Sequence, residues 1–141
     1  MATGPTHRNV TVERNANGVF TVTNSRGGRI AFGTGSEADF NPTELMLAAI
    51  GGCTAIDVDI LTSRRAEPET FEVRVEAEKV RDADGNHLAD IEVTFRIAFP
   101  VGAPGDAARA VLPEAVRQSH DRLCTVSRTI EIGTPITTRI E

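Results

Sequence analysis

The chain has 141 residues and a formal net charge of −5, a length that fits one domain with a real core. Nucleic-acid binding requires a basic stripe, and an acidic chain argues against one. The first nine residues lack the apolar core of a signal peptide, and Asp57 and Asp59 interrupt the only apolar run that approaches membrane-spanning length. We therefore expect a cytoplasmic protein that binds neither nucleic acid nor a membrane.

Alternating apolar and polar residues predict a small sheet in the first third of the chain. Val10–Arg14 and Val19–Asn24 alternate on either side of the turn Asn15–Gly18, which indicates a β-hairpin. Arg29–Gly33 supplies a third short strand after a glycine-rich turn. A mostly polar loop, Thr34–Phe40, then leads into the central stretch of the chain.

That central stretch, Asn41–Leu61, predicts a helix. Asn41 is suited to cap it, Pro42 to occupy its first position, and Glu44 to reach back to Asn41. The residues that follow are apolar nearly all the way round, which is typical of a helix buried on every side. We expect it to run to about Ser63. A small sheet and one further helix would cover it poorly, which favours a partner chain.

Two glycines lie inside this helix, at Gly51 and Gly52. Each costs about 1 kcal/mol against alanine in a helix interior. They permit another backbone to approach closely, or they mark a break that places Cys53 in the first turn of a second helical segment. The sequence leaves both alternatives open.

The second half of the chain predicts two long strands and a second helix. Phe71–Val80 and Leu88–Phe99 alternate apolar and polar residues across a turn, as antiparallel strands with one buried face do. Asp106–Leu123 has the pattern of a helix, kinked or restarted at Pro113, and Pro135–Ile140 resembles a closing strand. Residues 1–141 are therefore predicted to form a single α+β domain.

Cys53 and Cys124 are the leading candidates for chemistry. In the redox interpretation, Cys53 is a partly shielded nucleophile, and Cys124, in a looser segment, attacks an oxidised Cys53. In the structural interpretation both are buried core residues, since free cysteine is among the most buried residue types. In a cytosolic chain, two cysteines are more typical of free, catalytic or redox-active thiols than of a permanent structural disulfide.

Asp57 stands four residues after Cys53, on the same helix face if the helix continues. A carboxylate beside a thiol raises the pKa of the thiol, whereas an arginine that reaches both would reverse this effect. The alternative is that Asp57 pairs with a strand or a partner chain. His120 and Cys124 have helical spacing, but two ligands do not make a metal site, and we predict neither a metal nor a cofactor. The arginines available near the thiol are Arg8, Arg14, Arg29, Arg122 and Arg128.

Two segments carry a resemblance to a known family. Asn41–Val58, NPTELMLAAIGGCTAIDV, and His120–Thr129, HDRLCTVSRT, closely resemble the two cysteine-bearing segments of the OsmC/Ohr family, the osmotically induced and organic hydroperoxide resistance proteins. The order of strands and helices agrees over nearly the whole chain. The resemblance implies an OsmC-like fold, with antiparallel sheets wrapped around central helices in an intertwined homodimer.

The resemblance also implies an activity and its residues. Organic hydroperoxides would be reduced by a peroxidatic Cys53, and a resolving Cys124 would then form a disulfide with it. A dithiol of the lipoyl type would reduce that disulfide. An alternative function is a stress-associated dimer that binds an apolar small molecule, and a third is a thiol sensor without turnover.

The sequence departs from the family at its catalytic glutamate, which follows Asn-Pro directly and is here Thr43. Glu44 comes one residue later, about 13 Å of helical rise from Cys53, so it would act only across a subunit interface. Our hypothesis is that Arg14 activates Cys53, and that Asp57 or a partner chain's Glu44 orients this arginine.

Overall fold

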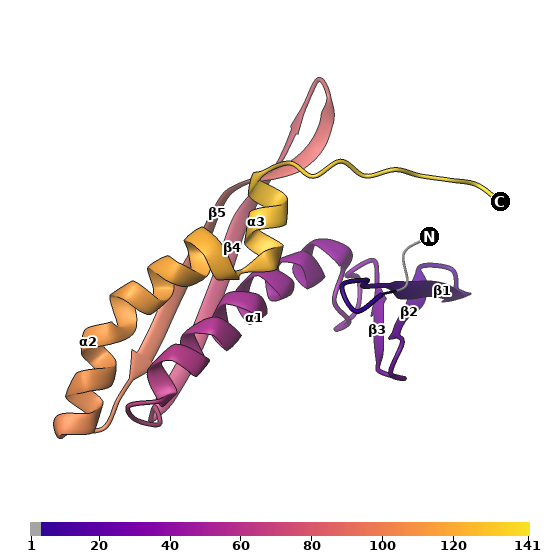
Figure 1. Ribbon diagram of the computed structural model, residues 1–141. Helices are drawn as coiled ribbons and strands as arrows, with labels where there is room; N and C mark the ends of the chain where they lie inside the picture. Colours follow the sequence, from indigo (N-terminus) through magenta and orange to yellow (C-terminus); the bar gives the residue numbers. More distant parts are fainter. Residues whose placement is uncertain (1–3) are drawn as a thin grey trace. The chain divides into compact units, whose positions relative to one another are not determined.

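The computed structural model describes residues 4–141, whose contacts separate into two compact units with a boundary between Met46 and Leu47. Figure 1 shows the first unit as a small sheet and the second as a long hairpin with helices. The structure has the α+β composition and antiparallel sheets predicted from the sequence. A single domain over residues 1–141 stays a prediction, and each unit is described by itself.

The first unit is a three-stranded antiparallel sheet in the order β1-β2-β3, formed by β1 (Val10–Ala16), β2 (Val19–Asn24) and β3 (Arg29–Gly33). The predicted hairpin and third strand are therefore confirmed. Opposed residues share one face of a sheet, and the register places Val12, Val22 and Ile30 in one row of such a face. Val12 and Ile30 remain more than half exposed, at 54% and 53%, so this apolar face is poorly covered.

The helix α1 (Pro42–Ser63) has the predicted bounds and the predicted start. The backbone N–H of Asn41 donates to Glu44 Oε1 at 2.9 Å, and the backbone N–H of Glu44 donates to Asn41 Oδ1 at 2.9 Å. This reciprocal pair is a capping box, which satisfies two donors that a helix start otherwise leaves free.

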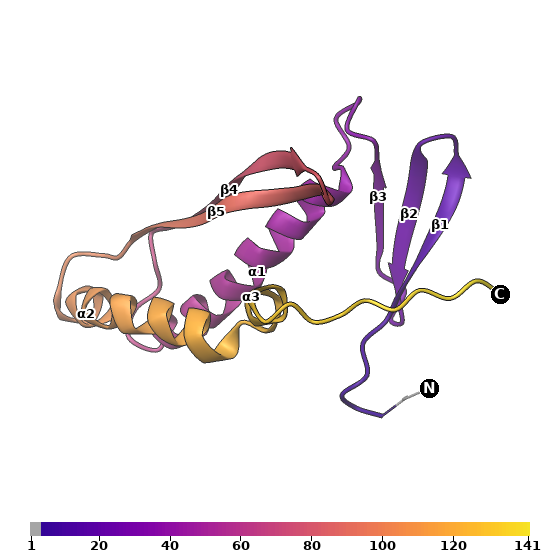
Figure 2. The same cartoon turned by 90° about the horizontal axis from the view of Figure 1, so that it is seen from above.

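In the second unit, β4 (Thr70–Asp82) pairs antiparallel with β5 (Gly85–Ala98). The helix α2 (Ala103–Gln118) and the part of α1 from Leu47 onward lie on the same face of this hairpin (Figure 1; Figure 2). The two long predicted strands are confirmed, and they supply the surface against which α1 packs.

The two glycines of α1 have different surroundings, and the helix continues through both. A Cβ atom at Gly51 would lie 2.7 Å from Cγ2 of Val75 on β4, whereas a Cβ at Gly52 would meet nothing within 4 Å. The close approach at Gly51 therefore comes from a strand of the same chain. The alternative of a helix break before Cys53 is wrong.

Within the described chain α1 is buried on one face only, and burial on every side, which we expect to require a partner chain, stays a prediction. Its buried residues form one face, whereas Ile56 and Ile60 are 63% and 51% exposed. One hairpin and its neighbouring helices cover only one side of a helix, so the opposite side stays open. The buried residues are Ile50, Gly51, Thr54, Val58 and Thr62.

The expectation that no segment suits a membrane also needs correction. Among the described residues α1 alone has the length and composition of a membrane span, with a mean hydropathy of 1.6 over its best window. A core helix of a soluble protein has the same length and composition, so this is weak evidence for a span. In the described chain 28% of this window is buried, and Val58 and Thr62 are its most buried side chains, both 0% exposed.

The second predicted helix differs in three respects from the structure. It begins earlier, at Ala103, where Pro104 suits a helix start. It continues through Pro113, because Ala108 and Ala115 on either side are buried and packing holds both halves. It then widens into the π-helical turn η1 (Ser119–Leu123), which a further helix, α3 (Thr125–Glu131), follows.

The predicted closing strand at Pro135–Ile140 is wrong. This segment has no regular structure in the described chain, and Ile136 and Ile140 are 92% and 99% exposed. A strand needs a neighbouring backbone to pair its N–H and C=O groups, and this segment pairs with none within residues 4–141.

The glycine pair provides a test of the packing on α1. Gly52→Ala should raise the free energy of unfolding by about 0.5–1 kcal/mol, since it improves helix propensity in open space. Gly51→Ala should lower it by about 1 kcal/mol, because the new methyl group overpacks Val75. Urea unfolding followed by circular dichroism measures both. A Gly52→Ala variant less stable than the parent would show that another surface packs there.

Candidate functional site

The two cysteines come together in the second unit. Cys53 lies in the middle of α1 and is half-buried, whereas Cys124 is 0% exposed and is the N-cap residue of α3. The Cys124 side chain lies close enough to Cys53 to raise the pKa of its thiol, so the two thiols are neighbours. The expectation that Cys124 lies in a looser segment is wrong, because η1 and α3 hold it on both sides.

The first turn of α3 lies beside both cysteines. The backbone amide of Val126 lies near Cys53 and lowers the pKa of its thiol. The backbone N–H of Ser127 donates to Cys124 Sγ at 3.4 Å, and the Ser127 Oγ lies 3.2 Å from the same sulfur. Amides at a helix start have no intrahelical partner, so these two groups are free to bond the thiols.

The pKa of the Cys53 thiol is raised from its ordinary value. Burial is the largest cause, and the hydrogen bond from the Val126 amide opposes it by favouring the thiolate. The Cys124 side chain raises the pKa through its hydrogen bond and its charge, and the charge of Asp57 raises it further. Since none of these groups is a cation, the described chain holds Cys53 mainly as a thiol at neutral pH.

Asp57 bonds a residue that the sequence did not suggest. Its Oδ2 accepts a hydrogen bond of 2.9 Å from Oγ of Ser119, the first residue of η1. Ser119 Oγ also lies 2.7 Å from Oγ1 of Thr54. Asp57 forms no ion pair with any residue between 4 and 141, so its predicted pairing with an arginine or a strand is not seen there.

Glu44 and Arg14, the other two predicted site residues, belong to the first unit. The carboxylate of Glu44 is engaged in the capping box. Arg14 lies on β1, opposite Phe20 and in the same cross-strand row as Phe32. Their catalytic roles stay predictions.

His120 connects the two segments that flank Cys124. Its Nε2 lies 3.0 Å from Glu131 of α3, and its Nδ1 lies 3.1 Å from Asp121. The pKa of His120 is raised, first by the hydrogen bond with Asp121 and next by the charge of Glu131. When it is protonated, the imidazole forms ion pairs that join η1 to α3. No three His, Cys, Asp or Glu side chains are grouped for a metal ion in the described residues.

A small hollow lies next to Ser127 and is lined by neither cysteine. Its volume is about 190 Å³, below the range of roughly 300–1,000 Å³ for drug-sized ligands. Ser127, which contacts Cys124, forms part of its wall. The remaining wall is mostly branched apolar side chains with two charged residues, contributed by Ile50, Ile91, Val93, Ile130, His120 and Glu131.

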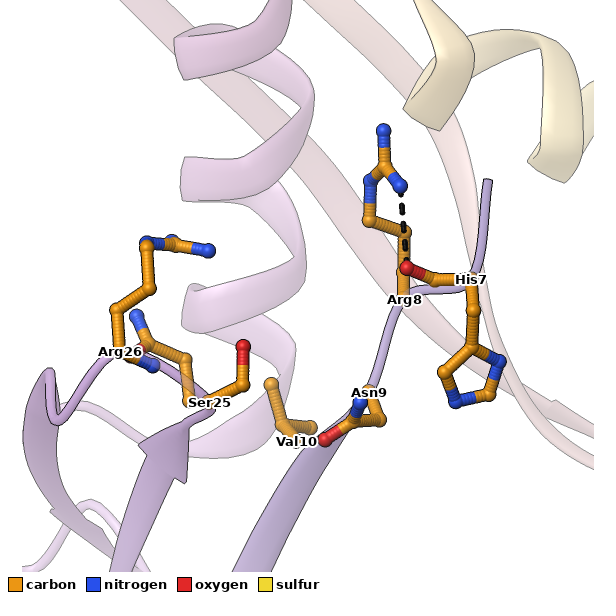
Figure 3. Close-up of a pocket in the computed structure, with 7 residues that line it drawn as sticks. His7, Arg8, Asn9, Val10, Ser25 and Arg26 are labelled. Carbon is orange, nitrogen blue, oxygen red and sulfur yellow. Dashed lines mark hydrogen bonds between the residues drawn. The ribbon is translucent and has the colours of Figure 1, made fainter. Parts of the chain in front are cut away.

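A second hollow, in the first unit, has a different character (Figure 3). Its volume is about 710 Å³, and its walls include His7, Arg8 and Arg26. The Arg8 guanidinium donates to the carbonyl oxygens of Pro5 and His7, at 2.9 and 3.1 Å. Among the described residues, none that lines it bonds a cysteine, whereas the smaller hollow includes Ser127, which bonds Cys124.

Sequence reasoning found Cys53, Cys124 and Asp57, which the structure brings together, and missed Ser119 and Ser127. Serine is common on helix surfaces, so a serine in the sequence does not by itself indicate a residue of a functional site. One signal was present for Ser127, since its position suits the third residue of a helix capped at Cys124. No local signal distinguished Ser119, because its partners lie on a distant helix.

Comparison with known proteins gives a family and a set of similar folds. The family model described as OsmC-like protein matches residues 33–139, a span that includes both cysteines. Among proteins with curated descriptions, none matches this sequence.

Three solved structures share the fold. A hypothetical protein from Aquifex aeolicus is 22% identical with a TM-score of 0.71, over 91% of this chain and 89% of that one. An OsmC-like protein of unknown function from Vibrio cholerae is 12% identical with a TM-score of 0.74, over 89% and 94%. An organic hydroperoxide resistance protein OsmC from Legionella pneumophila is 16% identical with a TM-score of 0.60, over 91% of each chain.

The charge of Asp57 can be tested through the Cys53 thiol. Asp57→Asn should lower the Cys53 pKa, because it removes a negative charge that disfavours the thiolate. The rate of alkylation by iodoacetamide, measured against pH with the modified cysteine assigned by peptide mapping, should shift to lower pH. Asp59→Asn, an exposed change on the same helix, should leave the profile in place. A shift to higher pH in Asp57→Asn would contradict this account.

Proposed function

Because this chain belongs to the OsmC-like protein family, we propose that it is a thiol-dependent peroxidase that reduces organic hydroperoxides. The observation that carries the proposal is the proximity of Cys53 and Cys124 at the start of α3. A peroxidase that resolves its own sulfenic acid needs two thiols within reach of each other. The name of the Legionella pneumophila structure, an organic hydroperoxide resistance protein, agrees with this activity.

The reaction uses the two thiols in turn. The Cys53 thiolate attacks one peroxide oxygen, the O–O bond breaks, and the other oxygen leaves as an alcohol after taking a proton, so Cys53 becomes a sulfenic acid. The Cys124 thiol then attacks the Cys53 sulfur, and water leaves as the disulfide forms. An external dithiol, of the lipoyl type, exchanges with this disulfide and restores both thiols while it is itself oxidised.

The hollow next to Ser127 supports an organic substrate. Its wall includes Ile50 on α1, one turn before Cys53, and Ile91 and Val93 on β5. An alkyl group placed there would be shielded from water, which favours an alkyl hydroperoxide over hydrogen peroxide.

Activation of Cys53 is the step that needs a further group. Attack requires the thiolate, and the pKa of Cys53 is raised by burial and by its neighbours. Arg14 stays the predicted activating cation, with Asp57 or a partner subunit's glutamate to orient it. Under that hypothesis Arg14→Ala raises the Cys53 pKa in the same alkylation measurement and slows peroxide consumption in parallel.

A homodimer is the assembly we propose. Ile56 and Ile60 on α1 are more than half exposed, as are Val12 and Ile30 on one face of the first sheet. Monomeric proteins rarely leave large contiguous apolar patches open. A second copy of the chain would cover such surfaces.

The raised pKa of Cys53 favours a second candidate function, a stress-associated dimer that binds an apolar small molecule without efficient turnover. A protonated thiol is a poor nucleophile, and the hollow would then serve as a binding site only. Turnover with a dithiol reductant separates the two functions.

Substitution of each cysteine tests the peroxidase. Cys53→Ser should abolish consumption of cumene hydroperoxide in the presence of a dithiol. Cys124→Ser should leave Cys53 open to overoxidation, since no thiol resolves its sulfenic acid, and mass spectrometry should find the sulfinic form. In the parent, peptide mapping after substoichiometric peroxide should show one Cys53–Cys124 link within a chain. If both variants consume peroxide as the parent does, the cysteines are structural.

Sedimentation tests the assembly. The parent should sediment with twice the chain mass at micromolar concentration. Ile56→Glu should shift it to the monomer, because a buried unpaired charge at the interface is costly. Val101→Glu, at a position that is 100% exposed in the loop between β5 and α2, is the matched control and should remain a dimer. A well-folded monomeric parent would overturn the proposal.

A further inference from the structure

Ser119 is a fully buried polar residue that the proposed reaction does not use. It is 0% exposed and begins the π-helical turn η1. Its hydroxyl contacts two side chains of α1, at 2.7 Å from Thr54 Oγ1 and 2.9 Å from Asp57 Oδ2. These are contacts between segments far apart in the sequence, so they fix where η1 meets α1.

The chemistry of the three groups sets the direction of both hydrogen bonds. An ionised carboxylate only accepts, and a hydroxyl has one proton to donate. Ser119 therefore donates to Asp57, and Thr54 donates to Ser119. Thr54 directly follows Cys53 and Asp57 lies one helical turn beyond it, so the Ser119 side chain is bound to α1 at the level of Cys53.

The backbone of Ser119 binds the other cysteine. Its carbonyl oxygen accepts a hydrogen bond of 2.8 Å from the backbone N–H of Cys124, five residues on. This bond closes the π turn. Ser119 therefore connects to Thr54 and Asp57 through its side chain and to Cys124 through its main chain.

We propose that Ser119 is a positioning residue that holds Cys124 against Cys53 and thereby sets how readily the two thiols form a disulfide. The equilibrium constant for forming a disulfide within a protein is proportional to the effective concentration of one thiol at the other. Without the Ser119 hydroxyl, η1 loses its polar attachment to α1, and Cys124 samples more positions. The use of the disulfide in turnover rests on the proposed function, but its formation does not.

The test is the equilibrium of the reduced protein with glutathione. Glutathione disulfide oxidises the two protein thiols to one protein disulfide and is itself reduced to two glutathione thiols, so the electrons balance. Ser119→Ala should lower the equilibrium constant by about tenfold, the change expected when a positioned hydrogen bond is lost. Thr62→Val is the matched control. It removes a buried hydroxyl of α1 that bonds only the Val58 carbonyl, at 2.8 Å, and should leave the constant unchanged.

Substitutions of Asp57 test the same hydrogen bond between η1 and α1 by changing its acceptor on α1. Asp57→Asn keeps an oxygen that accepts from Ser119, whereas Asp57→Ala removes it, and both remove the charge. The equilibrium constant should therefore fall several-fold further in Asp57→Ala than in Asp57→Asn. This pair decides the question if Ser119→Ala does not fold. Equal constants for the two Asp57 variants, or an equal fall in Thr62→Val, would overturn the proposal.

Failure of this inference is distinct from failure of the proposed function. The glutathione equilibrium involves no hydroperoxide, so it reports on Ser119 even in a protein without peroxidase activity. The converse outcome is also distinct. If the parent consumes hydroperoxide, and Ser119→Ala has the same kinetics and the same glutathione equilibrium as the parent, the peroxidase stands and the positioning role of Ser119 is wrong.

Discussion

The hydrogen bonds that Ser119 makes with α1 are the constraint on which the arrangement of the two cysteines depends. A buried hydroxyl without a partner costs free energy because no water replaces the missing bond. Ser119 meets this requirement at Thr54 and Asp57, so η1 has one favoured position on α1. The main-chain bond from Ser119 to Cys124 carries that position to the second thiol. A polar contact, set within an apolar helix, therefore brings the cysteines together.

The electrostatics of the site oppose the reaction that we propose for it. Burial, Cys124 and Asp57 all raise the pKa of Cys53, and only the amide at Val126 opposes them. Yet Asp57 is also the acceptor that anchors Ser119. The same carboxylate thus supports the position of one cysteine and disfavours ionisation of the other. A site built in this way gains from an additional cation that offsets the charge of Asp57 without displacing Ser119.

Features set by neighbouring residues could be predicted from the sequence. The capping box at Asn41 and Glu44, the limits of α1 and the hairpin of β1 and β2 follow from local hydrogen bonding and alternation. The position of Gly51 against Val75, and of Ser119 against Asp57, depends on how distant segments pack. Apolar periodicity gave no means to foresee either contact. It also indicates what a helix can bury and not how many surfaces one chain supplies, so the exposure of Ile56 and Ile60 in a single chain did not follow from it.

The π turn also determines which changes of chain length the thiol pair tolerates. Cys124 lies five positions after Ser119, whose carbonyl its amide binds, one position more than in an α-helical turn. Deletion of one residue between them would let an α-helical bond join the same two backbone groups, so the cysteine would stay on nearly the same side of the helix. Deletion of one residue within α2, where no wide turn absorbs the change, would instead rotate the residues that follow by about 100° around the helix axis. Cys124 would then turn away from α1, although every side chain of the site remained in the sequence.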